Sequence, residues 1–297
     1  MSLKLSVIIV TYNRRNDLKE CLDSIFSMRE LPHEVIVVDS FSNDETDKLV
    51  RGYPVKYVRI PEKSMVKARN VGLRYATGNI IAYVDDDAIV SKEWSTHILE
   101  PYSDEKVCGV GGRVLPYGIN ELNYDTTTLH KQIVGKVLKN GFIITNFDIP
   151  TSQSIEVDTF IGTNMSFRRV LLLKIGGFDE RFVGNCFREE TDTCLRLRRR
   201  GCRLIYAPKA LVWHKWKNKK LSIKHIYWTA RNHTYFYFKN VKPVITHISP
   251  FVQGLLALRN SKYPKRMGID INIHPFAYPF ALIGTAVGFF FALAKRD

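Results

Sequence analysis

Three consecutive carboxylates close an apolar, strand-like run in the first third of the chain. Asp85, Asp86 and Asp87 follow residues 80–84, and because side chains alternate along a strand, Asp85 and Asp87 can point to the same side. Carboxylate oxygens suit Mg²⁺ or Mn²⁺, which also bind diphosphate oxygens and neutralise the charge on a leaving nucleoside diphosphate. A solvated acidic turn is the alternative, but three unpaired carboxylates there are costly without a cation. The triplet therefore predicts a divalent-metal site.

Two other polar residues are placed to contact a nucleotide. Asp39 ends the apolar run of residues 34–38, where its carboxylate can accept a hydrogen bond from a base N–H. A helix N-cap or a turn aspartate explains Asp39 equally well. Arg69 lies on the helical pattern before the aspartate triplet and can reach phosphate oxygens, but on its own it can be an ordinary surface cation.

An acidic cluster opens a helical pattern later in the chain. Glu189, Glu190 and Asp192 precede a strongly basic stretch that ends at Gly201. Acidic residues at the start and basic residues at the end also suit the helix dipole, so simple helix electrostatics is one explanation. The functional hypothesis is a general base that takes the proton of an acceptor hydroxyl.

Strand-like and helical patterns alternate through the first half of the chain, which is typical of βαβ units and a mostly parallel sheet. We predict strands at residues 5–10, 34–38, 55–60 and 80–84, and helices at 16–28, 44–50 and 64–75. Ligand groups gather at the carboxyl ends of strands in open α/β sheets, and polar residues follow the first, second and fourth strands. The fold class is therefore α/β, with one crevice at three strand ends.

The second half of the chain is harder to interpret. Residues 88–160 indicate a mixed, loop-rich region, followed by helices at about 168–175 and 191–200 and a strand at 203–206. We divide the chain into three parts, residues 1–115, residues 116–215 and a basic, aromatic helical region at 216–297.

The composition excludes a disordered tail and favours a membrane partner. The chain has 297 residues, 45% of them hydrophobic, and a formal net charge of +15. Residues 193–269 hold 18 Lys and Arg and no Asp or Glu. This block runs into aromatic and apolar sequence, which favours a membrane surface over nucleic acid; a solvated basic face is the alternative. No nucleic-acid partner is expected, and a homo-oligomer stays open.

Two uncharged stretches near the C-terminus support membrane association. Residues 276–294 carry no charge over a length that just suffices for a helix to cross a bilayer, whereas residues 244–258 are shorter and contain Pro250. A buried core helix is the alternative for 276–294. Gly284 and Gly288 form a GxxxG pair that permits close helix contact. Because segments rich in Lys and Arg tend to stay on the cytoplasmic side of a membrane, we expect the protein at the cytoplasmic face of the cell membrane.

The chain has five cysteines, and no two of them have the spacing of a CxxC pair. Because an odd number cannot pair completely within one chain, we interpret them as reduced, cytosolic thiols. The first apolar run is too short and wrongly flanked for a secretory signal.

Several separated segments together resemble the inverting family 2 glycosyltransferases, which have the GT-A fold. The resemblance covers residues 3 to about 215. The matching segments are 7–14 (VIIVTYNR), 37–40 (VVDS), 68–72 (ARNVG), 85–87 (DDD), 162–168 (GTNMSFR), 176–182 (GGFDERF) and 195–201 (LRLRRRG). The resemblance implies a metal-dependent transferase of the hexosyltransferase type, which takes a sugar from a nucleoside-diphosphate donor to a glycan or polyprenyl-linked acceptor with Mn²⁺ or Mg²⁺.

The resemblance also implies roles for individual residues. Asp85 and Asp87 form the DxD motif, and Asp87 is the residue of the motif that binds the metal directly. His214 matches a position that joins the metal site in some members. Gly162 and Asn164 line the acceptor side. The nucleotide-binding set is Thr11, Tyr12, Asn13, Arg14, Asp39, Arg69, Asp85 and Asp86.

The chain departs from the family at the catalytic base. Members usually carry Glu-Asp where this chain has Glu189 and Glu190. The position of the usual aspartate is Glu190, so the base is either Glu190 or Asp192. If the acceptor is a polyprenyl phosphate, its nucleophile is already ionised near neutral pH, and the cluster only orients it.

Two other function classes remain as alternatives. A non-catalytic, GT-A-like membrane-associated binding module would not need both the acidic triplet and Glu190. A sugar-1-phosphate nucleotidyltransferase usually opens with a Gly-rich loop after the first strand, and this chain has no glycine before Gly52. The sequence leaves the donor base, the sugar, the linkage and the acceptor open.

Overall fold

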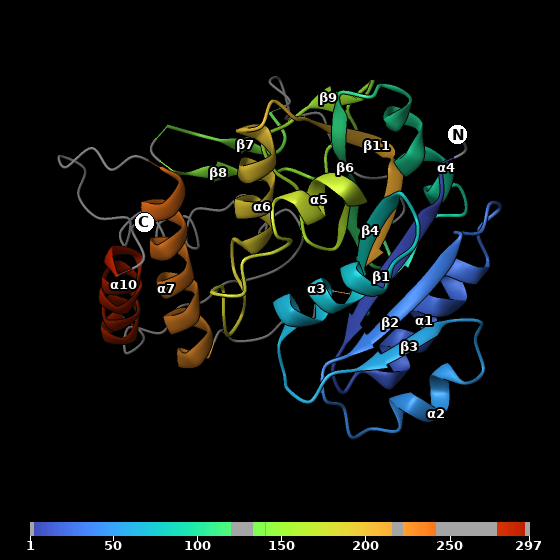
Figure 1. The fold of residues 1–297 in the computed structure, drawn as a ribbon, viewed down its shortest axis with the longest axis horizontal. Helices are drawn as coiled ribbons and strands as arrows, with labels where there is room; N and C mark the ends of the chain where they lie inside the picture. The colour runs from blue at the N-terminus through green and yellow to red at the C-terminus, as the bar shows by residue number, and fades with distance from the viewer. Residues whose placement is uncertain (1–2, 120–132, 140, 216–221, 242–277, 295–297) are drawn as a thin grey trace.

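The apolar runs of the N-terminal third form parallel strands, as their alternation with helices predicts. In the computed structural model, β1 (Leu5–Thr11), β2 (Glu34–Asp39), β3 (Lys56–Arg59) and β4 (Ile80–Asp85) lie in the order β3-β2-β1-β4 and pair in parallel. The structure describes residues 3–119, 133–139, 141–215, 222–241 and 278–294. The parallel arrangement brings the carboxyl ends of these strands to one edge (Figure 1).

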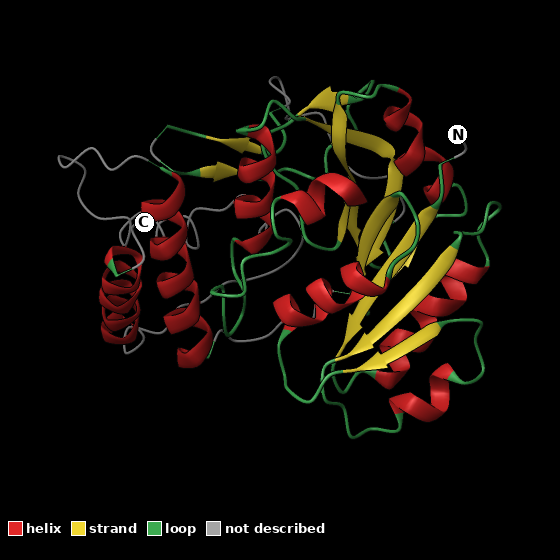
Figure 2. Cartoon of the chain, in the orientation of Figure 1, coloured by secondary structure: helices red, strands yellow, loops and turns green. Residues whose placement is uncertain are grey.

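The remaining elements extend this sheet and cover it (Figure 2). The other strands are β5 (Ala88–Val90), β6 (Val107–Pro116), β7 (Lys136–Val137), β8 (Ile143–Ile144), β9 (Ile155–Glu156), β10 (Asn164–Arg168) and β11 (Arg203–His214). The helices are α1 (Arg15–Phe26), α2 (Thr46–Val50), α3 (Met65–Tyr75), α4 (Trp94–Leu99), the 3-10 helix η1 (Glu100–Ser103), α5 (Arg169–Lys174), α6 (Glu189–Arg198), α7 (Ile223–Asn240) and α10 (Tyr278–Leu293).

Alternate side chains of the central strands pack against helices on opposite faces of the sheet. Val7 and Ile9 on β1 lie in a cluster with the apolar face of α1, whereas Ile8 packs with Val66 and Leu73 of α3. A strand buried on both faces needs a continuous apolar sequence, and residues 5–10 have one. These two layers hold the carboxyl ends of β1 and β4 rigidly in place.

The sheet continues beyond β4 through strands of both directions. β10 pairs antiparallel with both β4 and β6, β11 runs parallel to β6, and β5 pairs antiparallel with β11. The expectation of a loop-rich region at 88–160 is wrong for β6, which is a buried strand of ten residues. Likewise the strand expected at 203–206 extends to His214. The central sheet is therefore mixed and mostly parallel.

Helices α7 and α10 pack side by side at the end of the molecule away from β1–β3 (Figure 1). A Cβ added at Gly284 would lie 2.4 Å from the carbonyl oxygen of Tyr227, and one at Gly288 would lie 2.4 Å from that of Arg231. The two glycines of the GxxxG pair therefore allow the backbones of the two helices to approach closely.

Residues 276–294 and 244–258 are the two stretches that were expected to associate with a membrane. No helix in the described ranges combines the length and the apolar composition needed to cross a bilayer. The crossing helix expected at 276–294 is therefore not supported. The stretch 244–258 lies outside the described residues.

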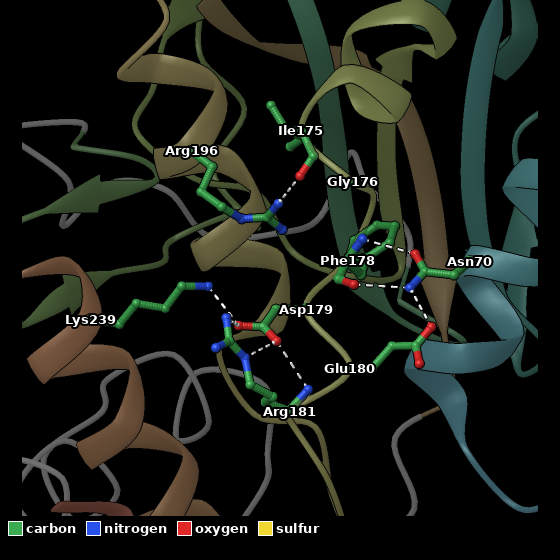
Figure 3. Close-up of a pocket in the computed structure, with 9 residues that line it drawn as sticks. All are labelled: Asn70, Ile175, Gly176, Phe178, Asp179, Glu180, Arg181, Arg196 and Lys239. Atoms are coloured by element: carbon green, nitrogen blue, oxygen red, sulfur yellow. Dashed lines mark hydrogen bonds and ion pairs between the residues drawn. The ribbon is translucent and has the colours of Figure 1, made fainter. Parts of the chain in front are cut away.

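A charged cluster joins α7 to α6 and to the loop after α5, around a cavity of about 430 Å³ (Figure 3). The carboxylate of Asp179 accepts hydrogen bonds from Arg181 and from Lys239 of α7, each at 2.7 Å. Lys239 also donates to Asp192 of α6 at 2.8 Å. The cluster thus fixes the position of α7 beside α6.

Two of the five cysteines form a disulfide, which corrects the interpretation of all five as reduced thiols. Cys108 on β6 is bonded to Cys202, which immediately precedes β11. Their sequence separation of 94 residues hides a contact that follows from the pairing of β6 with β11. Cys21, Cys186 and Cys194 are free and buried.

Candidate active site

Three potential metal ligands meet at the carboxyl end of β4. Asp85 ends β4, Asp87 follows it, and His214 ends β11, where it pairs with Ala88 of β5. One ligand atom from each of the three residues lies within 4.8 Å of the others. The Nε2 atom of His214 is 3.0 Å from Asp87 and 3.8 Å from Asp85. The antiparallel pairing of β5 with β11 therefore brings a histidine to the aspartates across more than 120 residues of sequence.

The surroundings of Asp86 and Asp87 shift their pKa values in opposite directions. Burial acts to raise the pKa of Asp87, but His214 and Arg14 outweigh it, and the pKa is lowered. Burial together with the charge of Asp87 raises the pKa of Asp86 to about 7, although Arg14 opposes this. Asp86 accepts hydrogen bonds from Thr11 at 2.8 Å and Arg14 at 2.9 Å. Asp87 is thus the ionised candidate ligand, whereas Asp86 is bonded to Thr11 of β1 and to Arg14.

This donor set fits a divalent cation. Two carboxylates and one imidazole are suitable ligands for Mn²⁺, and the carboxylates also suit Mg²⁺. Asp85 keeps a third of its side chain exposed, whereas Asp87 and His214 are more enclosed. The site therefore has one open side, where diphosphate oxygens and water can complete the coordination.

The proposed base-binding aspartate is held by two hydrogen bonds at the end of β2. Asp39 is buried, and its carboxylate accepts hydrogen bonds from the backbone N–H of Ser42 at 2.8 Å and from the hydroxyl of Tyr57 at 2.6 Å. A carboxylate has about four lone-pair positions, so two remain for a ligand N–H. No helix begins at Asp39, so the N-cap alternative is wrong, whereas the bond from the backbone N–H of Ser42, three residues later, agrees with the turn-aspartate alternative.

The loop after β1 lies between Asp39 and the triplet. Asn13 has a positive φ of 51° and donates its backbone N–H to Ser42. The ring of Tyr12 lies under the ammonium of Lys63, 3.7 Å from the ring centroid. Arg14 pairs with both Asp86 and Asp87. The structure therefore brings the predicted nucleotide-binding residues of this loop to one edge of the sheet.

Arg69 is the central cation of the site. It is only 3% exposed and forms an ion pair with Glu189 at the start of α6. Its guanidinium also lies 3.3 Å from Asp85 and donates to the carbonyl of Gly162 at 3.2 Å. Arg69 is not an ordinary surface cation, because it connects α3, β4 and α6.

The acidic cluster on α6 separates into three different environments. Glu189 is paired with Arg69, and Asp192 is fully buried and bonded to Arg196, Lys239 and Asn240. Glu190 has no ion pair with any described residue. Burial raises its pKa, an effect that Asp85 strengthens and that Arg188 and Arg69 oppose. Glu190 is therefore the carboxylate of the cluster with properties suited to a general base.

The acceptor-side prediction is wrong for Asn164. This residue is 0% exposed, and its amide donates to the carbonyls of Arg113 and Ala210 and accepts from the indole of Trp94. Its side chain therefore fixes β10 in the interior and cannot line a surface. Gly162 differs, because it is partly exposed and contacts Arg69.

Two residues of the site were missed by the sequence analysis. The hydroxyl of Thr163 donates to Asp85, and Tyr57 donates to Asp39. Thr163 lies between Gly162 and Asn164, two residues that the sequence analysis assigned to the site. Its place in that segment could therefore have identified it as a site residue. Tyr57 lies on β3 and carried no local signal, since only strand pairing places it beside Asp39.

Curated relatives of the chain are glycosyltransferases. It is 25% identical to a glucosyl-dolichyl phosphate glucuronosyltransferase of Haloferax volcanii over 226 residues, which are 72% of this chain and 69% of that protein. It is 28% identical to a chondroitin synthase of Escherichia coli, over 71% of this chain but only 34% of that protein.

Solved structures share the fold. A mannosyltransferase of Pyrobaculum calidifontis, solved with GDP-Man and Mn²⁺, superposes with a TM-score of 0.60 at 22% identity and covers 100% of this chain and 77% of that one. Residues 1–349 of TarS from S. aureus superpose with a TM-score of 0.61 at 18% identity, over 99% of this chain and 82% of that one.

The family model of glycosyl transferase family 2 matches residues 6–176, which is more than half of the chain. The matched range contains the carboxyl ends of β1, β2 and β4 and the residues 162–168 that support Asp85. The chain therefore belongs to glycosyl transferase family 2 and is a glycosyltransferase with a GT-A-like fold.

Proposed function

We propose that this chain transfers a sugar, with inversion, from a nucleoside-diphosphate sugar to a lipid-linked or membrane-proximal acceptor, with Mn²⁺ or Mg²⁺ as the cofactor. The observation that carries the proposal is the meeting of Asp85, Asp87 and His214 within reach of one cation. Residues 1–115 hold the donor in this proposal, and residues 116–215 contribute the acceptor side.

Donor binding uses the edge at which three parallel strands end. Asp39 accepts a base N–H, the loop from Thr11 to Arg14 contacts the nucleotide, and Arg69 places positive charge beside the diphosphate. A cation held by Asp85, Asp87 and His214 supplies charge neutralisation for the departing nucleoside diphosphate. These residues bind and orient the donor so that its anomeric carbon faces α6.

The transfer step requires a proton acceptor on the side opposite the leaving group. The acceptor hydroxyl forms a bond to the anomeric carbon as the bond to the diphosphate oxygen breaks, and Glu190 takes the hydroxyl proton. Attack from the opposite face inverts the configuration. The absence of an ion-pair partner for Glu190 among the described residues supports this role, since a paired carboxylate is a weaker base.

Three observations support an acceptor at the cytoplasmic face of a membrane. Residues 193–269 are basic without a single acidic residue. The Haloferax relative is named for a dolichyl-phosphate-linked substrate. Helix α10 also exposes large apolar side chains, at Phe280, Leu282, Ile283, Val287, Phe290 and Leu293. An apolar helix face beside basic sequence is typical of interfacial attachment.

A donor panel tests the proposal. Purified full-length protein is incubated with Mn²⁺ or Mg²⁺ and with UDP-, GDP- and dTDP-sugars, and release of nucleoside diphosphate is measured with and without membrane lipid extract. We expect metal-dependent release from one donor, raised by the lipid. No release or binding with any donor would contradict the proposal and favour a non-catalytic binding module.

A further inference from the structure

Arg188 is a buried cation at the start of α6 that the transfer mechanism above does not use. It is the N-cap residue of α6, with a φ of 78°, and only 6% of its surface is exposed. A non-glycine residue in the left-handed region is uncommon, and Arg is not among the residue types enriched there. The backbone therefore directs this side chain into the interior at a conformational cost.

The guanidinium of Arg188 forms no ion pair with any residue that the structure describes, although Glu190 acts on it through its charge. Its Nε donates to Nδ1 of His233 on α7 at 3.5 Å, and its guanidinium carbon lies 4.2 Å from the ring centroid of Phe187. Within the described ranges its two terminal nitrogens donate to no atom. The contrast is Arg69, equally buried, which pairs with Glu189 and Asp85.

Arg188 keeps its charge despite its burial. Burial lowers its pKa to about 10, with an opposing effect from Glu190, so the guanidinium is protonated at neutral pH. Burial and the charge of Arg188 lower the pKa of His233 to about 3. His233 is therefore neutral, and it orients the guanidinium without balancing its charge. Glu190 affects Arg188 through its charge without an ion pair, and a buried cation with no anion in direct contact is costly.

The position of Arg188 connects it to the proposed acceptor side. Arg188 lies two residues before Glu190, and each side chain affects the pKa of the other through its charge. The first turn of α6 adds the partial positive charge of a helix N-terminus, which favours oxyanions. Arg188 and Glu190 thus present a cation and a base at the same end of one helix.

The cavity of Figure 3 is a useful contrast, because its charges are satisfied within the protein. Asp179 is paired with Arg181 and Lys239, and Arg196 is paired with Asp192. Glu180, which also lines the cavity, is an exposed carboxylate that accepts a hydrogen bond from Asn70. No described cation of the cavity lacks an ion pair. The cavity therefore gives no reason to expect an anionic ligand.

We propose that Arg188, oriented by His233 at the N-terminus of α6, binds an oxyanion of the acceptor, so that the acceptor is an acidic molecule carrying a phosphate or carboxylate. The bound oxyanion supplies the direct ion pair that the guanidinium lacks and holds the acceptor's nucleophilic group toward Glu190. This assignment rests on the proposed function only in giving the oxyanion to the acceptor; the anion site itself does not depend on it.

Titration of inorganic phosphate tests the anion site without requiring turnover. Isothermal titration uses the full chain in EDTA at low ionic strength, because without metal the carboxylates of Asp85 and Asp87 repel phosphate. We expect saturable binding that Arg188→Asn weakens by about tenfold or more and that Arg188→Lys largely retains. Asparagine suits both the N-cap and the left-handed backbone.

Matched controls separate loss of the site from loss of the fold. Arg200→Asn makes the same charge change at an exposed residue just beyond the other end of α6, and phosphate affinity should not change. Arg188→Gln is a second neutral variant that keeps more of the side-chain length, and thermal unfolding checks each variant. Absence of saturable binding in the wild type, or equal affinity in both neutral variants and the wild type, would overturn the anion site.

A second titration decides which substrate carries the oxyanion. The affinity for the nucleoside diphosphate is measured with Mn²⁺ present, for wild type and Arg188→Asn. We expect no change in this affinity, together with a raised KM for a phosphate- or carboxylate-bearing acceptor. A loss of nucleoside diphosphate affinity as large as the loss of phosphate affinity would assign the oxyanion to the donor and overturn the acceptor assignment. If no donor is turned over, the proposed function fails while the phosphate titration still reports on Arg188.

Discussion

Glu190 and Asp192 lie on the same first turn of α6, but their surroundings give them different chemistry. Asp192 is saturated by Arg196, Lys239 and Asn240, so it is bound in a structural network. Glu190 has a raised pKa and no ion pair in the described part of the chain. The residue types alone do not decide whether Glu190 or Asp192 is the base. The partners of each carboxylate do, and they favour Glu190.

Replacing these two carboxylates separately should produce different defects. Glu190→Gln removes the proton acceptor and keeps the shape, so we expect kcat to fall by about 10²–10⁴-fold with little change in Tm. Asp192→Asn should lower Tm because it leaves Lys239 and Arg196 without their shared carboxylate. Steady-state kinetics and thermal unfolding of both variants measure these effects. A fully active Glu190→Gln variant would contradict the assignment.

The pH dependence of the reaction should report on Glu190. Burial raises the pKa of Glu190 above its usual value of about 4.3. Because a base acts when ionised, kcat/KM should fall as the pH decreases through this raised pKa. The acid limb of the kcat/KM profile should therefore lie above pH 4.3, and it should be absent from the residual activity of Glu190→Gln. An acid limb at or below the usual value would exclude Glu190 as the base.

Residue patterns predict which candidate metal ligands meet at the end of β4, but they predict the supporting residues poorly. The aspartate triplet follows an apolar strand, and a strand end fixes where its side chains meet a ligand. Asn164 shows the limit, since nothing local tells a binding amide from one that satisfies interior carbonyls. Tyr57 shows another, because its contact with Asp39 depends on the register between β2 and β3.

At the scale of elements, the order β3-β2-β1-β4 comes from strands that were predictable, whereas most of the mixed part of the sheet beyond β4 was not. Residues 5–10 and 80–84 are short, continuous apolar runs bounded by polar residues, which indicate buried strands. In contrast, β6 contains Gly109, Gly111 and Gly112, where an added Cβ would contact Phe160 or Asn164 closely. Glycine weakens a strand pattern, so this buried strand resembles a loop in the sequence.

The link between α7 and the loop after α5 should depend on pH through Asp179. Burial acts to raise the pKa of Asp179, but hydrogen bonds from Arg181 and Lys239 outweigh it and hold the pKa well below its usual range. The ionised pair therefore stabilises the fold above a pH of about 4, and this stability is lost as the pH decreases toward the folded-state pKa.

Asp179→Asn should lower the free energy of unfolding by about 1–3 kcal/mol at pH 7. The difference from wild type should shrink below about pH 4, where the unfolded carboxyl is protonated in the wild type. Urea unfolding at several pH values measures both effects. A difference that stays constant from pH 7 to pH 3 would show that the charge of Asp179 does not stabilise this contact.

At the scale of the whole molecule, the exposed apolar face of α10 should bind a lipid surface. Phe290 is 67% exposed and Ile283 53% exposed, which is unusual for side chains of this size on one short helix. Replacing both with serine should reduce the fraction of full-length protein that co-floats with vesicles containing anionic lipid. Val170 and Leu173 on α5 are also exposed, and their double serine variant is the control. Equal flotation of both variants and the wild type would contradict attachment through α10.

The compartment of the protein stays a proposal at this scale. The basic block of residues 193–269 favours the cytoplasmic face of a membrane, whereas the disulfide between Cys108 and Cys202 is a bond that reducing compartments rarely retain. The disulfide was not predicted from the sequence, because the two cysteines are far apart along the chain and β6 and β11 become neighbours only through the mixed sheet.

Metal-dependent release of nucleoside diphosphate by wild type and Asp87→Ala is the most direct measurement of the central claim. Asp87 is the ionised carboxylate that lies nearest to His214 and that forms part of the three-residue ligand group. We predict release by the wild type in Mn²⁺ or Mg²⁺, none in EDTA, and none by a folded Asp87→Ala variant. Full activity of that variant would contradict the claim that this site at the end of β4 holds the metal and performs the transfer.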